Sequence, residues 1–415
     1  MTTHRRQLML TALGTIALAA AGLVPAQAQD KSVTIGIELP LTGADADSAT
    51  RIKNGAIMAI DDANAKGGAG GYKLNVTVLD SGTSTAGQYD PAQAATNAKK
   101  LVADPSVVAI VGPEMSGEGK AMTPILSAAN LATVTPSSTN PDITDPKFAA
   151  QYKPGGKAIY FRTVTTDAYQ GPNMANYMRD TLKVKSVYIL DDSGAYGVGM
   201  SNAFEAQAKK IGLNVMGHDQ LDPKEADYTT ALTKIKQLNP DAIYYGGVAQ
   251  AGVKVAKQSY DIMPNVIKAG GDGMVDGGIL SGVGFPAIEG WYATQASPDA
   301  VDDPTNSDWA ARYTKTFNMT PSLYAITAYD AAVVVIDAVK RVAESGQPMN
   351  RDTVRDAIQQ SKVNTMQGPI SFDENGDITT KVISVWQIHH DAAHPEDDVQ
   401  HQYKYIGVAP EAPAT

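Results

Sequence analysis

Short apolar runs alternate along this chain with longer stretches in which apolar residues recur at helical spacing. Apolar runs of about four to eight residues are typical of buried strands, and recurrence at helical spacing is typical of a helix with one buried face. In the first part of the chain the pattern predicts strands at 33–39, 74–79, 107–111 and 132–135, with helices at 50–65, 90–102 and 121–130. This alternation indicates an open, mostly parallel sheet covered by helices.

A polar stretch at 140–156, rich in Pro and Gly, predicts a connection, after which the alternation restarts. The second series predicts strands at 160–163, 186–190, 214–218, 242–245 and 266–269, with helices at 170–182 and 195–211. We therefore expect an α/β protein with two doubly wound units in tandem.

A third section must pack onto one of these units, and its periodicity does not indicate which. It has an extended run at 290–293 and predicted helices at 308–317, 323–345 and 351–359. Farther on, Asn375-Gly376 lies between strand-like runs at 370–372 and 382–388 and predicts a β-hairpin.

The N-terminal residues 1–28 have the features of a secretory signal peptide. Arg5 and Arg6 precede an apolar run at 8–24, and an Ala-x-Ala cleavage site follows at 26–28. A membrane anchor is the alternative, but polar and glycine residues dilute the run. Export by the general secretory or the twin-arginine route then places a soluble mature protein in the periplasm.

The amino-acid composition excludes several classes of function. The chain has no cysteine, which excludes thiol catalysis, cysteine-ligated zinc, iron–sulfur clusters and disulfides. Lys and Arg number 34 against 44 Asp and Glu, which gives a net charge of −10. This balance does not fit a nucleic-acid-binding protein, since phosphate binding needs concentrated positive charge. We expect small molecules or other proteins as partners.

Catalytic and metal-binding motifs are incomplete. The Gly-rich stretch at 112–121 has its Lys too late for a phosphate-binding P-loop and lacks the hydroxyl residue that should follow it. Ser116 lacks the flanking glycines of a nucleophile elbow. His390 and His394 have the spacing of metal ligands on a helix, although a solvated loop is the simpler interpretation. We therefore expect no enzyme activity, no cofactor and no bound metal.

Small polar and glycine residues follow several predicted strands, at the strand ends where open α/β sheets bind ligands. They lie at 41–43, 112–116 and 136–139 in the first unit and at Tyr196, 244–247 and 271–273 in the second. Hydroxyls and free backbone N–H groups ahead of helices bind carboxylates. Asp272, bracketed by glycines, can approach an ammonium group closely. Each feature alone is also ordinary loop chemistry, but together they predict a cleft with a carboxylate-binding wall and a cation-binding wall.

An ordered set of short motifs runs through nearly the whole chain after residue 28. The motifs are Ile35-Gly36, Pro40-Leu41-Thr42-Gly43, Asn54-Gly55-Ala56, Asn64-Ala65-Lys66-Gly67-Gly68, Thr135-Pro136-Ser137-Ser138-Thr139-Asn140-Pro141, Arg162-Thr163, Gln170-Gly171-Pro172, Tyr196-Gly197, Tyr244-Tyr245-Gly246-Gly247 and Gly368-Pro369-Ile370-Ser371-Phe372-Asp373. No single motif is decisive, but in this order they resemble the leucine/isoleucine/valine-type periplasmic solute-binding proteins of ABC importers.

The resemblance implies a type I periplasmic binding fold, in which two Rossmann-like lobes are joined by a three-crossover hinge. It implies a first lobe of 29–163 and 295–367 and a second lobe of 164–294 and 368–415. The helices of the third section then return to the first lobe, and the C-terminal hairpin belongs to the second.

The resemblance also implies the ligand-binding residues, which are Ser116, Ser137, Ser138, Thr139, Tyr196, Gly247 and Asp272. Ser116, Ser137 and Thr139 stand where the family binds the α-carboxylate of an amino acid. Asp272 stands where an acid binds the α-ammonium, and Tyr196 where an aromatic side chain covers the ligand.

The sequence departs from the family pattern around the ligand's side chain. Ser48 and Val248 stand where relatives have aromatic residues, and Met115 lies near one position of a disulfide that is absent here. Asp272 is one methylene shorter than Glu. These departures concern side-chain specificity and leave the α-amino and α-carboxylate recognition intact.

By this resemblance the protein delivers an amino acid, branched-chain or otherwise aliphatic, to the permease subunits of an ABC importer when its lobes close. A working hinge favours a monomer. Because the aromatic residues are missing, another small carboxylate (aromatic or dicarboxylic) or an amide is the first alternative. A sensory ectodomain and an enzyme on the same fold are the others.

Overall fold

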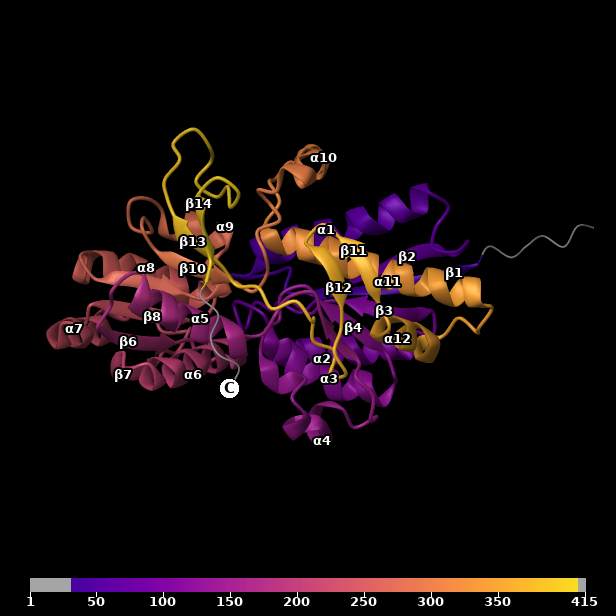
Figure 1. Cartoon of the computed structure of the whole chain (residues 1–415), viewed down its shortest axis with the longest axis horizontal. Coiled ribbons are helices and arrows are strands. Elements are labelled where there is room, and N and C mark those ends of the chain that lie inside the picture. The colour runs from indigo at the N-terminus through magenta and orange to yellow at the C-terminus, as the bar shows by residue number, and fades with distance from the viewer. Residues whose placement is uncertain (1–30, 410–415) are drawn as a thin grey trace, which may run out of the picture.

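Two sheets lie side by side, each with its own helices, and form the two lobes of the molecule (Figure 1). The computed structural model describes residues 31–409. The predicted signal peptide at 1–28 lies outside the described residues. The two-lobed α/β fold that the sequence predicts is confirmed.

The first sheet has the strand order β2-β1-β3-β4-β5, and all neighbouring strands are parallel. Its strands are β1 (Ser32–Leu39), β2 (Lys73–Asp80), β3 (Val107–Val111), β4 (Ala132–Thr135) and β5 (Tyr160–Arg162). All of β3 is buried, as is β1 after Ser32, because helices cover both faces of the sheet. The strand order reverses at β1 and β3, which is where sheets of this kind bind ligands.

Helices from both halves of the chain cover the first sheet. They are α1 (Ala46–Ala65), α2 (Pro91–Ala103), α3 (Ser116–Ala128), α11 (Leu323–Ser345) and α12 (Arg351–Gln359). The helices α1 and α11 pack along each other, and Gly55 permits this approach because a Cβ there would collide with the carbonyl oxygen of Ala325. The helices of the third section α11 and α12 thus return to the first lobe.

The second sheet has the order β14-β13-β10-β9-β8-β6-β7. The strands from β10 to β7 are parallel, and β13 and β14 are antiparallel additions at one edge. The strands are β6 (Ser186–Asp191), β7 (Asn214–Gln220), β8 (Ala242–Gly246), β9 (Ile267–Gly270), β10 (Tyr292–Gln295), β13 (Ser384–Ile388) and β14 (Tyr403–Val408). The helices of this lobe are α5 (Asp167–Asp180), α6 (Ala195–Lys210), α7 (Thr229–Leu238), α8 (Ala249–Ile262) and α9 (Gly277–Val283).

Shorter elements complete the fold. They are α4 (Ala149–Tyr152), α10 (Ser307–Phe317), β11 (Lys362–Thr365), β12 (Gly368–Ser371) and the 3-10 turns η1 (Pro141–Ile143), η2 (Pro146–Phe148), η3 (Asp272–Met274) and η4 (Pro304–Asn306). Strands β11 and β12 pair as an antiparallel hairpin beside α11 (Figure 1). Within residues 31–409, no helix has the length and apolar character needed to span a membrane.

Two predictions about how the chain connects its strands are wrong. Strand β5 pairs with β4, so the stretch at 140–156 lies within the first lobe and the second lobe begins with α5. The hairpin predicted across Asn375-Gly376 does not form a strand pair, because β12 pairs with β11 while β13 pairs with β10 and β14. A single bridge between Phe372 and Ile378 closes the turn instead.

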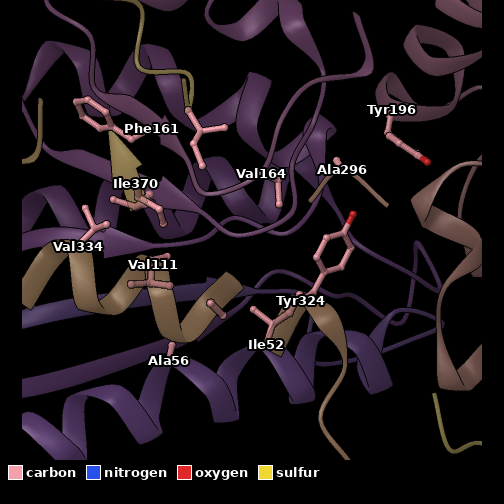
Figure 2. Packing of buried hydrophobic residues seen from close by; sticks show 14 of the residues in the cluster. Ile52, Ala56, Val111, Phe161, Val164, Tyr196, Ala296, Tyr324, Val334 and Ile370 are labelled. Atoms are coloured by element: carbon pink, nitrogen blue, oxygen red, sulfur yellow. The ribbon is translucent and has the colours of Figure 1, made fainter. Parts of the chain in front are cut away.

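This turn also changes the expected course of the chain. Phe372 packs on Phe161 of the first lobe with ring centroids 5.1 Å apart, and Ile370 lies in the same buried cluster (Figure 2). Residues 368–372, which the family resemblance assigns to the second lobe, therefore pack on the first. The other lobe boundaries stay predictions.

Three chain segments connect the lobes, after β5, after β10 and after β12, and they lie together. The backbone N–H of Thr165 donates to the carbonyl oxygen of Ala296 at 2.8 Å. The hydroxyl of Ser384 donates to the carbonyl oxygen of Ser297 at 2.9 Å. The connections thus form one narrow hinge region beside the paired lobes.

Candidate functional site

A hollow opens between the lobes at the carboxyl ends of their strands, with a volume of about 460 Å³ measured out to its mouth. The first lobe lines this interlobe hollow with Asp45, Ser48, Glu114, Met115, Ser116, Ser137 and Tyr324, and the second with Tyr196, Val248, Ala249, Asp272, Gly273, Val275 and Asp276.

The N-terminus of α3 forms one side of the interlobe hollow. Ser116 is the first residue of this helix, which begins earlier than the predicted start at 121. The Glu118 carboxylate accepts a hydrogen bond from the N–H of Met115 at 3.0 Å and fixes the first turn. Ser116 is buried, and its Oγ accepts the N–H of Asn140 at 3.2 Å. Free N–H groups and the positive end of the helix dipole suit this side to a carboxylate.

The loop after β4 carries the other predicted hydroxyls. Ser137 lines the hollow, and its hydroxyl donates to the carbonyl oxygen of Glu114 at 3.1 Å. Ser138 and Thr139 are buried but are not lining residues. The Ser138 hydroxyl donates to Ser116 Oγ at 3.3 Å, and the Thr139 carbonyl accepts an N–H from the start of α5 at 3.0 Å. These two residues therefore shape the loop rather than the surface of the hollow.

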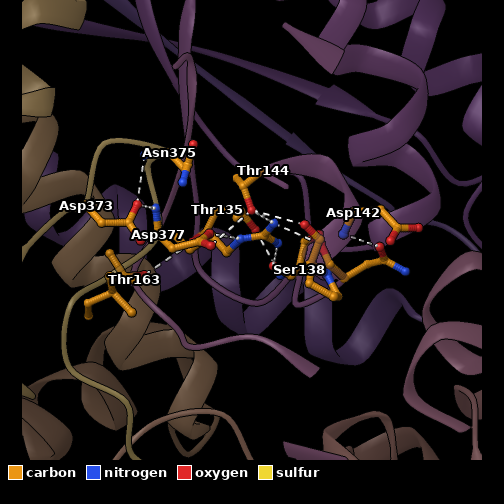
Figure 3. A network of polar contacts seen from close by, with 12 residues as sticks. Thr135, Ser138, Asp142, Thr144, Thr163, Asp373, Asn375 and Asp377 are labelled. Atoms are coloured by element: carbon orange, nitrogen blue, oxygen red, sulfur yellow. Dashed lines mark hydrogen bonds and ion pairs between the residues drawn. The ribbon is translucent and has the colours of Figure 1, made fainter. Parts of the chain in front are cut away.

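Arg162 holds this loop in place by hydrogen bonds to several residues, of which Figure 3 labels Ser138, Thr144 and Asp377. Its fully buried guanidinium donates to the carbonyl oxygens of Ser138 at 2.7 Å and Asn140 at 2.8 Å, and to the Thr144 hydroxyl at 2.9 Å. It also pairs with Asp377 at 2.7 Å. Because the donors of a guanidinium have a fixed planar geometry, this network fixes the backbone course of the loop.

Asp272 lies in the wall contributed by the second lobe, and three donors hold its buried carboxylate. Tyr196 donates its hydroxyl at 2.8 Å and Gln170 its side-chain N–H at 2.5 Å, both from the second lobe. The Tyr324 hydroxyl donates from α11 of the first lobe, and its ring points away from that helix toward Tyr196 (Figure 2). Burial raises the pKa of Asp272, opposed by these hydrogen bonds. A carboxylate has about four acceptor positions, so one is left for a ligand.

Tyr196 lines the hollow as expected, whereas Gly247 does not. The Tyr196 ring lines the hollow, but its hydroxyl is tied to Asp272 and to a backbone N–H at 3.0 Å. Gly247 is not a lining residue, because it packs against Asp192: a Cβ on Gly247 would lie 2.7 Å from the Asp192 carboxyl carbon. The two residues that follow Gly247 line the hollow instead.

Three further buried carboxyls line the hollow, and none of them is among the predicted ligand-binding residues. Asp45 accepts the N–H of Tyr89 at 2.9 Å, and Asp276 caps α9 by accepting the N–H of Ile279 at 2.8 Å. Burial raises the pKa of Asp45 and of Asp276 to about 7, and it raises the pKa of Glu114 well above its usual range. Asp45 and Glu114 follow the two strands where the first sheet reverses, which is the signal that could have found them.

The lining is therefore acidic at four positions, and no Lys, Arg or His side chain lines the hollow among residues 31–409. No described group of three or more potential ligands is arranged to hold a metal ion. The histidines near the C-terminus pair with carboxylates, His394 with Asp391 and His401 with Asp398, both at 2.8 Å. The hollow can thus bind a carboxylate at α3 and hydrogen-bond donors on its acidic side.

Comparison with known proteins gives a consistent result. A family model described as periplasmic binding protein matches residues 32–392. The Leu/Ile/Val-binding protein BraC3 of Rhizobium johnstonii is 32% identical over 356 residues, which cover 86% of this chain and 91% of that protein. The leucine binding protein LivK from Thermotoga maritima has a similar fold, with a TM-score of 0.77 at 24% identity over 91% of this chain and 98% of that one.

A solute-binding protein of an ABC transporter from R. palustris, solved in complex with benzoate, shares the fold as well. Its TM-score is 0.75 at 18% identity, covering 92% of this chain and 97% of that one. The fold therefore accommodates different carboxylates in different proteins.

Proposed function

Because this chain belongs to the periplasmic binding protein family, we propose that it is a periplasmic solute-binding protein that delivers a free amino acid to an ABC importer. The observation that carries the proposal is the interlobe hollow, which has the N-terminus of α3 in one wall and Asp272 in another. The name of BraC3 supports a branched-chain or otherwise aliphatic amino acid as the ligand.

Each of the two polar walls binds a different group of the amino acid. Ser116 and the first N–H groups of α3 bind the α-carboxylate, because buried N–H and O–H donors stabilise negative charge. Ser137 joins them when its single O–H turns from the Glu114 carbonyl to the ligand. Asp272 accepts a hydrogen bond from the α-ammonium at its remaining acceptor position. Ser138 and Thr139 support the carboxylate wall from behind.

Closure of the lobes couples ligand binding to transport. Three of the contacts that cross between the lobes are Tyr324 to Asp272, the Asn140 side chain to the Ala195 carbonyl at 2.8 Å, and the Gln250 side chain to a first-lobe carbonyl at 3.1 Å. Opening about the hinge would break all three. A ligand that bridges both walls therefore favours the closed form, and the closed form presents one surface to the permease subunits.

The proposal extends to the cellular setting. The protein acts as a monomer in the periplasm, after export by the signal peptide at 1–28, and it releases its ligand unchanged. The periplasmic binding protein family and the basic–apolar–Ala-x-Ala pattern of the N-terminus support this proposal.

A thermal-unfolding screen tests the proposed function. The mature protein, residues 29–415, is unfolded, washed free of ligand, refolded and mixed with amino acids, amides, aromatic acids or dicarboxylates. A ligand at a hundred times its Kd adds about 2.7 kcal/mol of stability, which raises the Tm by several degrees. Stabilisation by amino acids supports the proposal.

The benzoate complex of the similar structure favours one alternative, an aromatic or dicarboxylic acid without an amino group. The same screen separates the two ligand classes. Stabilisation only by acids without an amino group would keep the transport role and overturn the assignment of Asp272 to the α-ammonium.

A further inference from the structure

We propose that the interlobe hollow has a second recognition end, formed by Glu114 and Asp276, that binds N–H donors on the ligand's side chain. The ligand is then an amino acid whose aliphatic side chain ends in an ammonium, guanidinium or carboxamide group. The inference rests on the proposed function, because it takes binding of an amino acid in this hollow as its premise.

Unpartnered acceptors mark this end. Glu114 and Asp276 line the hollow from opposite lobes and are only 5% and 7% exposed. Glu114 Oε2 and Asp276 Oδ2 accept no hydrogen bond from any described residue. Buried polar atoms in native proteins almost always have a partner, and leaving one without a partner is costly. Donors that enter through the hollow would satisfy both oxygens.

The charges around these two carboxyls indicate the same class of ligand. Asp45, 2% exposed, lines the hollow beside them, and no basic side chain does so within residues 31–409. Arg51, whose charge acts on Asp276, is already engaged by Asp47 at 2.8 Å and by backbone carbonyls. Asp272 is likewise held by three donors. Ser48, which also lines the hollow, offers a hydroxyl to Glu114, so what this acidic end lacks among residues 31–409 is a free cation.

Calorimetry with matched ligand pairs tests the inference on the unaltered mature protein. L-Lysine is compared with L-norleucine and L-ornithine with L-norvaline, since each second member lacks only the terminal nitrogen. L-Glutamine is compared with L-glutamate, which exchanges N–H donors for acceptors. We expect at least one nitrogen-bearing member to bind ten-fold or more tightly than its partner.

Variants that replace each carboxyl group by its neutral amide test whether Glu114 and Asp276 bind the terminal nitrogen. Glu114→Gln and Asp276→Asn should reduce the advantage of the nitrogen-bearing ligand at least ten-fold relative to the unaltered protein. Asp261→Asn is the matched control, because Asp261 is exposed near the C-terminal end of α8 and does not line the hollow. The Tm of each variant is measured as a check on folding. If a variant does not fold, the ligand pairs on the unaltered protein still decide.

Each outcome has a defined meaning. An advantage for lysine or ornithine supports a cationic ligand, and an advantage for glutamine alone supports a neutral amide. If none of lysine, ornithine and glutamine binds more tightly than its partner, the inference is wrong and the proposed function stands. An advantage that survives both neutral variants also overturns it. If no amino acid binds, the proposed function itself fails.

Discussion

The carboxylate of Asp272 brings together side chains from both lobes. Tyr196 and Gln170 reach it from the second lobe, whereas Tyr324 reaches it from α11. The hydrogen bond from Tyr324 can form only when the lobes are together. Asp272 therefore has two roles in our account: it binds the α-ammonium, and it contributes to closure.

Ser116 permits a test on the carboxylate side. We predict that Ser116→Ala weakens the binding of L-leucine by about 1–3 kcal/mol, because the ligand carboxylate loses a donor and the Asn140 N–H loses its acceptor. Isothermal titration calorimetry measures the change. Ser307→Ala is the control, since Ser307 is also the first residue of a helix but is exposed. Equal affinities for the two variants would remove Ser116 from the site.

The candidate site could be predicted from sequence only in part. Ser116, Ser137 and Asp272 stand out because hydroxyls and glycine-bracketed acids at strand ends have a recognisable chemistry. Glu114 and Asp276 resemble ordinary loop acids along the chain. Their burial results from the meeting of two lobes, which no local pattern records.

Local sequence patterns predict the individual helices and strands better than they predict the site. The predicted bounds of β3, β4, α11 and α12 agree with the structure, because apolar runs and helical spacing are properties of contiguous residues. The partner of a strand is a long-range property. For this reason two predictions are wrong: that 140–156 connects the two units, and that a hairpin forms across Asn375-Gly376. The strand-like runs near both places exist.

The contact between α1 and α11 depends on the small size of Gly55. We predict that Gly55→Ala lowers the stability by about 1–3 kcal/mol, because the added Cβ overlaps the backbone of Ala325 in a close-packed contact. Thermal unfolding followed by circular dichroism measures the loss. Asp61→Ala, on the exposed face of α1, should change the stability by no more than about 0.5 kcal/mol. A Gly55→Ala protein as stable as this control would contradict the packing argument.

For the whole molecule, the acidic interlobe hollow makes ligand-free stability depend on pH. Burial raises the pKa of Asp45 and Asp276 to about 7, whereas an unfolded chain has Asp pKa values near about 3.9. Between these values the folded state binds more protons than the unfolded state. The stability that these two groups contribute then falls as pH rises from the lower of these values toward the higher.

Thermal unfolding of the ligand-free protein between about pH 5.5 and 8 tests this dependence. We predict that the Tm falls by several degrees on going up to about pH 7. Asp276→Asn should flatten this slope, since it removes one of the raised titrations, whereas Asp261→Asn should leave it unchanged. A Tm that rises with pH over this range would contradict the burial of neutral carboxyls in the ligand-free hollow.

The central claim is that Asp272 recognises the α-ammonium of an amino acid held between the lobes. Calorimetric titration of L-leucine and of its 2-oxo acid, 4-methyl-2-oxopentanoate, into the mature protein and its Asp272→Asn variant tests this claim most directly. The account predicts that the variant loses about 1.5–3 kcal/mol more of L-leucine binding than of 2-oxo acid binding, as expected for a hydrogen bond to a charged group, since any effect on lobe closure is common to both ligands. Equal affinity of the unaltered protein for both ligands, or an equal loss for both in the variant, would contradict it.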